Sequence, residues 1–336
     1  MYTIKKESGN AVEVLSDLIG AIRSFSDTEN IFRNEIGNND IQNLTQNSVE
    51  VESKGITESI PAEFFERFGI RSLTLNTFHG RLKLSEGIFG NSERNSIIQY
   101  KWHDFKTDVI IEDLKVLFRN CQIIPFANWS NVYRASDLWY GLLSDVIKPM
   151  NKRDFDFIFY LGDPTKRLIF EVDEILDIIS EFSLYGRVTF VLDEGEAIKL
   201  WALLNGKDPE TTFLNMDSFA LKNKYLSIFN TMNVEHLVIY SDDHAMLFSK
   251  QYHFEIARRK PNNVQITNDL RDSFCAGYGL GLQRQMEISH CMALGMTVSG
   301  AYAESGTTPG KEALLSYMEK WITEIESAAA DTNDVF

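Results

Sequence analysis

The chain has 336 residues, of which 44% are hydrophobic, so it is long enough to bury a substantial core and to fold alone. Its formal net charge of −15 argues against nucleic acid or an anionic membrane as a partner, because both bind clusters of Lys and Arg. The three cysteines lack the paired spacing of a zinc site. Since the amino terminus is polar and no apolar run is long enough to cross a bilayer, we expect a cytoplasmic protein with buried thiols.

The first 70 residues have the weakest pattern in the chain. Residues 12–26 have the apolar spacing of a helix, whereas residues 30–47 are rich in Asn and Gln and have no strong apolar period. We interpret the latter run as a loop or an insertion, and residues 1–70 as a divergent amino-terminal segment.

An alternating pattern begins at residue 72. Residues 72–78 and 81–84 alternate apolar with polar side chains on either side of a His-Gly turn, which predicts a β-hairpin. Such a hairpin could project from a main sheet.

Apolar strands and amphipathic helices then alternate as far as residue 240. This order is typical of βαβ units with a mostly parallel sheet, so the fold class is α/β. Three closing helices follow, and residues 328–336 should fray. We expect one domain over residues 71–327, including the hairpin 72–84. The predicted strands are 122–126, 155–161, 188–192 and 236–240, and the predicted helices are 136–147, 172–182, 194–204, 273–285, 287–301 and 311–327.

The segment 267–278 places Asp272 directly before an apolar helix. Taken alone, an acidic residue at this place is an N-cap. The small residues that follow in 279–282, 293–296 and 299–309 change that interpretation, because together with Asp272 they resemble the carboxy-terminal signature of the PfkB carbohydrate kinases. The resemblance implies a ribokinase-like three-layer sandwich with a mostly parallel central sheet, a small β lid hairpin and a shortened amino-terminal part.

In that family the matching aspartate is the general base, which takes the proton from a sugar hydroxyl as it attacks the γ-phosphate of ATP. The Gly-Ala-Gly before it forms an anion hole of backbone N–H groups at a helix amino terminus. Here Asp269, Leu270 and Arg271 stand in its place. Bulky side chains hinder the close approach of a phosphate, and a carboxylate repels it. Arg271 could offset this with its positive charge.

Two further segments resemble family motifs at the ends of strands. Asp163-Pro-Thr-Lys-Arg167 resembles an Asp-Pro-x-x-Arg turn near the ligand, although an ordinary Asp-Pro turn is the alternative. Asp193-Glu-Gly-Glu196 matches Asn-x-x-Glu, with Asp193 in place of Asn. The resemblance gives Glu196 a part in organising water around Mg²⁺, and a solvated helix start is the alternative.

Ser241 follows the strand 236–240, where the family has a turn near the nucleotide, and His244 is interpreted as a turn residue. Asn128-Trp129-Ser130 resembles the Asn-Trp-Ser of a bacterial subgroup, in which Trp129 would either line the substrate cleft or belong to the core. The hairpin resembles the subgroup's lid, which closes over the sugar and through which two chains could form a homodimer.

The resemblance thus assigns residues to three groups, with ATP, Mg²⁺ and a small-molecule sugar or nucleotide as ligands. Catalysis falls to Asp272 and Arg271, the nucleotide to Asp193, Glu196, Ser241, Asp269 and Leu270, and the substrate to Asn128, Trp129, Asp163 and Arg167. The metal falls to Glu196 alone.

Two functions remain open at this point. One is an active sugar kinase; the other is a pseudokinase that serves as a nucleotide-binding or protein-binding scaffold. The replaced glycines favour reduced or lost activity, and the family's sugar-binding aspartate and Gly-Gly-Asn segment cannot be placed in the first third of the chain. We set a dehydrogenase aside, because the glycines from Gly277 lack dinucleotide spacing and do not follow a strand.

Overall fold

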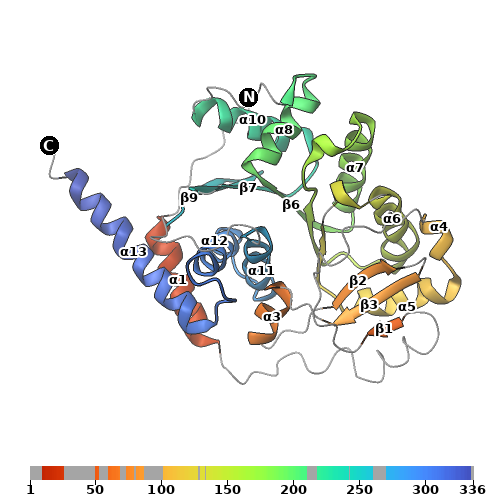
Figure 1. Cartoon of the computed structure of the whole chain (residues 1–336), viewed down its shortest axis with the longest axis horizontal. Coiled ribbons are helices and arrows are strands. Elements are labelled where there is room, and N and C mark those ends of the chain that lie inside the picture. The colour runs from red at the N-terminus through yellow and green to blue at the C-terminus, as the bar shows by residue number, and fades with distance from the viewer. Residues whose placement is uncertain are drawn as a thin grey trace.

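The computed structural model describes residues 10–25, 50–52, 60–68, 73–78, 81–86, 101–127, 129–132, 134–209, 218–241, 243–259 and 270–333. Within these ranges the chain forms a large sheet with helices on both faces and a smaller three-stranded sheet (Figure 1).

The large sheet has the strand order β4-β5-β6-β7-β8-β9. Its first four strands are parallel and its last two are antiparallel, so the predicted mostly parallel α/β sheet is confirmed. All six residues of β5 are buried, as expected for a parallel strand that helices cover on both faces. The strands are β4 (Ile123–Phe126), β5 (Phe155–Tyr160), β6 (Gly186–Asp193), β7 (His236–Tyr240), β8 (His244–Ser249) and β9 (His253–Ala257).

Two hydrophobic cores lie on opposite faces of this sheet. Phe157 and Phe159 of β5 pack into one core, whereas Ile158 and Tyr160 pack into the other, because successive side chains of a strand point to opposite faces. Helices α5 (Asp108–Arg119), α6 (Ala135–Gly141), α7 (Ile169–Phe182), α8 (Glu194–Leu204) and α10 (Ser218–Thr231) cover the first face. Helices α1 (Ala11–Ser24), α3 (Ile60–Arg67), α11 (Leu270–Gln283), α12 (Ile288–Ser305) and α13 (Lys311–Asn333) cover the second.

Helices α11 and α12 pack closely through glycines. A Cβ atom on Gly277 would lie 2.6 Å from the carbonyl oxygen of Leu294, and one on Gly281 would lie 2.8 Å from the Cα atom of Cys291. Both separations are shorter than van der Waals contact, so the glycines let the two backbones meet. The glycine repeat in α11 therefore serves helix packing.

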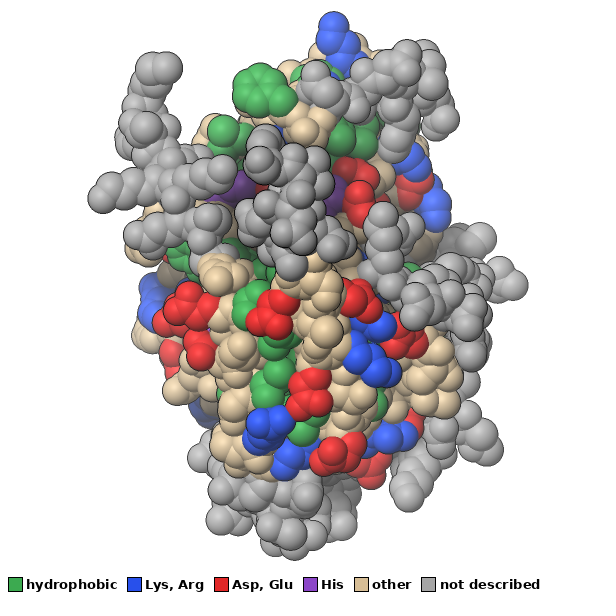
Figure 2. Space-filling model, turned by 90° about the vertical axis from the view of Figure 1, so that its left-hand side faces the viewer, with side chains coloured by type: hydrophobic (Ala, Val, Ile, Leu, Met, Phe, Trp, Pro, Cys, Tyr) green, Lys and Arg blue, Asp and Glu red, His purple; other side chains and the backbone are tan. Residues whose placement is uncertain are grey.

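On the outer side, α13 lies against α1, and Arg23 of α1 pairs with Glu319 of α13 over 2.7 Å. Figure 2 shows acidic and basic side chains close together on this side of the molecule. Since like charges are interspersed with opposite ones, this face offers no concentrated field of one sign.

The smaller sheet contains the predicted hairpin. Strand β2 (Leu73–Phe78) pairs with β3 (Arg81–Glu86) in antiparallel register, and β1 (Glu50–Glu52) pairs with β3 in parallel. The hairpin prediction is confirmed, while its turn at residues 79–80 and the run 30–47 lie outside the described residues. The division into three chain segments stays a prediction.

Other expectations differ from the structure in detail. The helix expected at 136–147 is α6 followed by a π-helical turn over Leu142–Ile147. The helix expected at 311–327 is α13, which extends to Asn333. His244 begins β8 and does not belong to a turn, a correction that follows from its pairing with Ala257 of β9. None of the helices in the described part of the chain has an apolar stretch that could span a lipid bilayer.

The three cysteines are free thiols, and only Cys291 is fully buried. Burial raises the pKa of Cys121 and of Cys291, and raises that of Cys275 well above its ordinary value. A raised thiol pKa disfavours the nucleophilic thiolate, so these cysteines are structural.

Candidate functional site

The carboxyl ends of β4, β5, β6 and β7 meet at one edge of the large sheet, because these strands are parallel neighbours. Open α/β sheets bind ligands at this edge. Five of the eleven predicted site residues lie at or just beyond the ends of these strands: Trp129, Asp163, Asp193, Glu196 and Ser241. The first turn of α11 comes to the same edge through contacts described below.

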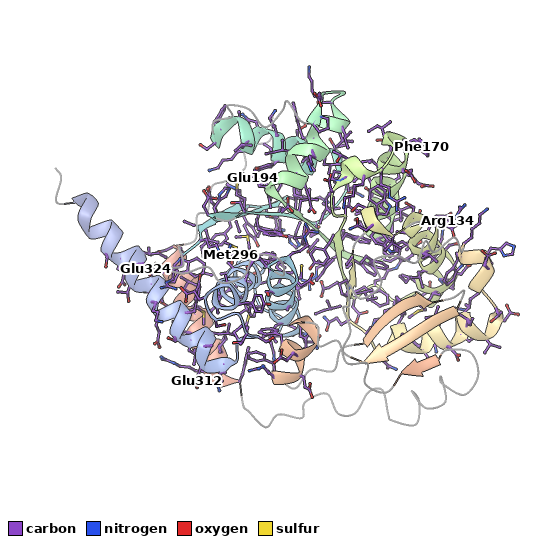
Figure 3. All side chains as sticks on the ribbon, viewed as in Figure 1. Arg134, Phe170, Glu194, Met296, Glu312 and Glu324 are labelled. Carbon is purple, nitrogen blue, oxygen red and sulfur yellow. The ribbon has the colours of Figure 1, made fainter. Side chains whose placement is uncertain are left out.

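Asp193 and Glu196 shape the start of α8 as a capping box. Asp193 Oδ1 accepts a hydrogen bond from the backbone N–H of Glu196 at 2.7 Å, and Glu196 Oε2 accepts one from the backbone N–H of Asp193 at 3.1 Å. These carboxylates satisfy amide groups that a helix amino terminus leaves without partners. Glu194 is the first residue of α8 and is labelled in Figure 3. Its Oε1 accepts a hydrogen bond from the hydroxyl of Tyr225 at 2.9 Å.

Arg271 joins this capping box to α11. Its Nη2 donates to Asp193 Oδ2 at 2.8 Å and also to Glu196 Oε1, while its Nε donates to the hydroxyl of Tyr240 at 3.1 Å. The ring of Tyr240 stacks on Phe274 with their centroids 4.8 Å apart, which fixes the position of the hydroxyl. Residues from α8, β7 and α11 therefore form one cluster at the sheet edge.

The cluster is partly withdrawn from solvent. The side chain of Glu196 is 7% exposed, whereas those of Asp193 and Arg271 are 36% exposed. Burial raises the pKa of Glu196 to about 7, and the Arg271 guanidinium opposes this shift. Burial also raises the pKa of Tyr240 well above its ordinary value, so this phenol is neutral when it accepts from Arg271.

A divalent cation does not fit between these carboxylates as they stand. Each of their four oxygens already accepts a hydrogen bond from Arg271 or from the backbone of the capping box. The Arg271 guanidinium also places a positive charge where Mg²⁺ would need to bring its own. Within the described ranges, no group of three or more His, Cys, Asp or Glu side chains could hold a metal ion.

The first turn of α11 contains Leu270, Arg271 and Asp272, because the helix begins three residues earlier than predicted. Asp272 therefore lies inside the first turn and is not an N-cap. It is half-buried. Acidic groups are stabilised at this end of a helix by the macrodipole. Asp269 lies outside the described residues.

Asp163 is bound within the protein at the end of β5. Its Oδ2 accepts a hydrogen bond from Lys199 Nζ of α8 at 2.6 Å, and its Oδ1 accepts from the backbone and hydroxyl of Thr165. The pKa of Asp163 is lowered, because these hydrogen bonds and the Lys199 charge outweigh its partial burial, the largest single effect. Asp163 thus fixes a turn and ties it to α8.

Arg167 holds the turn after β4. Its Nη2 donates to the carbonyl oxygens of Trp129 at 3.0 Å and Val132 at 2.5 Å, and its guanidinium lies over the Trp129 ring, 5.3 Å from the centroid. Trp129 is 1% exposed, and its Nε1 donates to the hydroxyl of Ser136 at 2.9 Å. Trp129 is therefore a core residue, the alternative that the sequence left open. Asn128 lies outside the described residues.

Ser241, Asp243 and His244 lie together after β7. His244 Nδ1 is 2.6 Å from Asp243 Oδ1 and 3.0 Å from Ser241 Oγ. A nucleophilic triad needs the serine and the acid on different ring nitrogens, so this cluster is not one. Its hydrogen bonds brace the turn that leads into β8.

The structure thus brings Asp193, Glu196 and Arg271 into one cluster, and joins Arg167 to Trp129 in another. Sequence reasoning missed Tyr240 and Lys199. Tyr240 could have been found as the last residue of a predicted strand at the binding edge, and Lys199 as a residue one turn beyond Glu196 on the same helix.

Comparison with solved structures finds sugar and nucleoside kinases. They include Arabidopsis thaliana ribokinase complexed with ribose and ATP (12% identity; 63% of this chain and 59% of that chain; TM-score 0.44) and Thermotoga maritima ribokinase (12%; 76% and 75%; 0.44). Adenosine kinase from Sinorhizobium meliloti is a third (11%; 75% and 66%; 0.44). The chain thus spans about three fifths of the length of the first of these proteins.

No curated protein matches the chain. A family model described as prokaryotic ketohexokinase, however, matches residues 54–321, well over half of the sequence. This range contains the capping box, Arg271 and Asp272. The chain therefore belongs to the prokaryotic ketohexokinase family, among the ribokinase-like PfkB carbohydrate kinases.

Proposed function

We propose that the chain is a carbohydrate-kinase homologue that binds ATP and a sugar at the carboxyl edge of its large sheet, with phosphoryl transfer reduced or lost. In this proposal Asp272 is the base for the sugar hydroxyl, as in the family pattern, and its place in the first turn of α11 supports that role. Leu270 and Ser241 would lie near the nucleotide, and Asp163, Trp129 and Arg167 would support the substrate side.

One observation carries the proposal of weak transfer: the hydrogen bonds that hold Arg271. A phosphate could draw on the guanidinium only if those to Asp193, Glu196 and Tyr240 weakened. Releasing Arg271 would leave two carboxylates close together without a counter-charge. The compensating charge that could replace the family's anion hole is thus already engaged inside the protein.

The same observation favours a second candidate function, a pseudokinase. If the anion hole is lost and Arg271 stays bound to α8, the fold could still bind a nucleotide or another protein without chemistry. The two candidates differ in a measurable way, because only the kinase needs the carboxylate of Asp272. Pairing of two chains through the hairpin β2–β3 stays a prediction under either candidate.

The experiment combines calorimetry of ATP binding with turnover on a panel of sugars, for the wild type and Asp272→Asn. Slow turnover that Asp272→Asn abolishes would support a weakened kinase. ATP binding without turnover would support the pseudokinase. No binding at millimolar ATP would contradict the proposal that this edge is a nucleotide site. A matched control is Asp173→Asn, which removes an exposed carboxylate from α7, on the side of the sheet opposite α11.

A further inference from the structure

We propose that Arg271 permanently takes the place of a divalent cation between Asp193 and Glu196, so that this site of the wild-type chain binds neither Mg²⁺ nor Mn²⁺. The inference rests on the proposed function only for the assignment of this carboxylate pair to the family's metal region. Its physical content comes from the contacts of the cluster.

All four carboxylate oxygens of Asp193 and Glu196 accept hydrogen bonds from within the protein. Glu196 Oε1 and Asp193 Oδ2 both accept from Arg271 Nη2, and the other two oxygens accept from backbone amides of the same capping box. A metal ion, or water bound to it, would need at least one of these oxygens as an acceptor. A cation that bridged Asp193 Oδ2 and Glu196 Oε1 would need the place from which Arg271 Nη2 now donates to both, so Arg271 would have to leave.

The positive charge of Arg271 also opposes the binding of a divalent cation to this carboxylate pair. When both carboxyl groups are ionised, they and the guanidinium leave a net charge of −1. A divalent cation that entered beside Arg271 would meet a positive charge at hydrogen-bonding distance from the carboxylates that would bind it. The cation could bind well only after Arg271 had left. The Arg271 guanidinium is therefore the cation that neutralises this carboxylate pair, at a position where the family has glycine.

Tyr240 holds the Arg271 guanidinium from a third direction. Its Nε donates to the hydroxyl of Tyr240, and Tyr240 is itself stacked on Phe274, three residues after Arg271 on α11. A guanidinium presents its donors in one rigid plane, so bonds from Nη2 and Nε together set its orientation. If the guanidinium left the carboxylates, it would lose its hydrogen bonds to Asp193, Glu196 and Tyr240 together.

A titration of the full chain with Mn²⁺, followed by the electron paramagnetic resonance of the free ion, tests the inference. The wild type should show no site that depends on Glu196. Arg271→Met should gain a site of at least about tenfold higher Mn²⁺ affinity, because one positive charge has been removed from the pair. The double variant Arg271→Met with Glu196→Gln should lose that gain.

Arg187→Ala is the matched control, because it removes an arginine that pairs with the single carboxylate of Asp156. It should gain no comparable site. Circular dichroism checks that each variant is folded, and Arg271→Gln serves if the Met variant is not.

Two results would overturn the inference: Mn²⁺ binding by the wild type that Glu196→Gln abolishes, or folded Arg271 variants that gain no Mn²⁺ affinity. The titration contains neither ATP nor sugar. A failure of the proposed kinase function therefore leaves its outcome unchanged, and the two can fail separately.

Discussion

Arg271 Nη2 lies 2.8 Å from Asp193 Oδ2 and thereby joins the first turn of α11 to the N-cap of α8, although the two residues are 78 apart in sequence. We predict that Arg271→Met lowers the free energy of unfolding by about 2 kcal/mol, because it leaves the nearly buried Glu196 without its charged partner. Urea denaturation measures the loss.

A double-mutant cycle with Glu196→Gln separates this pairing from lost packing. Because the neutral amide needs no counter-charge, the two changes together should cost clearly less than the sum of the single changes. Strict additivity would show that the guanidinium and Glu196 do not interact.

The close packing of α11 on α12 gives a second prediction. Gly277→Ala should destabilise the protein by about 1–3 kcal/mol, because the new Cβ meets the backbone of Leu294 and cannot be accommodated by a side-chain movement. Gly20→Ala in α1 is the matched control, because nothing lies within 4 Å of its Cβ position. The better helix propensity of Ala should stabilise that variant by about 0.5–1 kcal/mol. The midpoint of thermal unfolding should fall for Gly277→Ala and rise for Gly20→Ala. Midpoints that shift in the same direction would rule out the packing explanation.

His236 predicts a loss of stability in acid. This side chain is buried, its Nδ1 has no hydrogen-bond partner within the described ranges, and burial together with Arg187 lowers its pKa to about 4. Its folded form is therefore neutral, while the unfolded chain takes up a proton below pH 6.5. The neutral His236 makes its full contribution to the free energy of unfolding above pH 6.5. This free energy falls by up to about 3 kcal/mol as the pH drops from 6.5 to 4.

His236→Gln should flatten this part of the stability profile, measured by urea unfolding between pH 4 and 7. His103→Gln, at an exposed position, should leave the profile unchanged. An identical acid slope in the wild type and His236→Gln would refute the assignment.

Arg167 gives a prediction about the turn after β4. Arg167→Ala should cost about 2 kcal/mol, because two carbonyl oxygens lose their donor and Trp129 loses the guanidinium that lies over its ring. Lys166→Ala, one residue earlier and exposed, should cost less than about 0.5 kcal/mol. Denaturant midpoints of the two variants test this, and equal costs would mean that Arg167 does not hold the turn.

The sequence predicts the four parallel strands β4 to β7, because apolar runs of Ile, Val and Phe that alternate with helices are typical of βαβ units. It does not predict β8 and β9. Strand β8 begins with His244 after a polar turn, and its pairing with β7 depends on an antiparallel reversal that periodicity does not reveal. The sequence also does not predict the early start of α11, because Leu270 and Arg271 are as compatible with a loop as with the first turn of a helix.

The site shows the same division. Sequence reasoning can note that Arg271 replaces a glycine, but not the direction of its side chain. That direction follows from the arrangement of β6, β7 and α11, which brings Asp193, Tyr240 and Arg271 together from distant parts of the chain. It also could not show that Arg167 and Asp163 bind partners within the protein.

The most direct measurement is an anomalous difference map from crystals of the chain grown with an ATP analogue and Mn²⁺. The account predicts the Arg271 guanidinium between Asp193 and Glu196, and no manganese peak within coordination distance of either carboxylate. A manganese peak there, with the Arg271 side chain turned towards the phosphates, would contradict it.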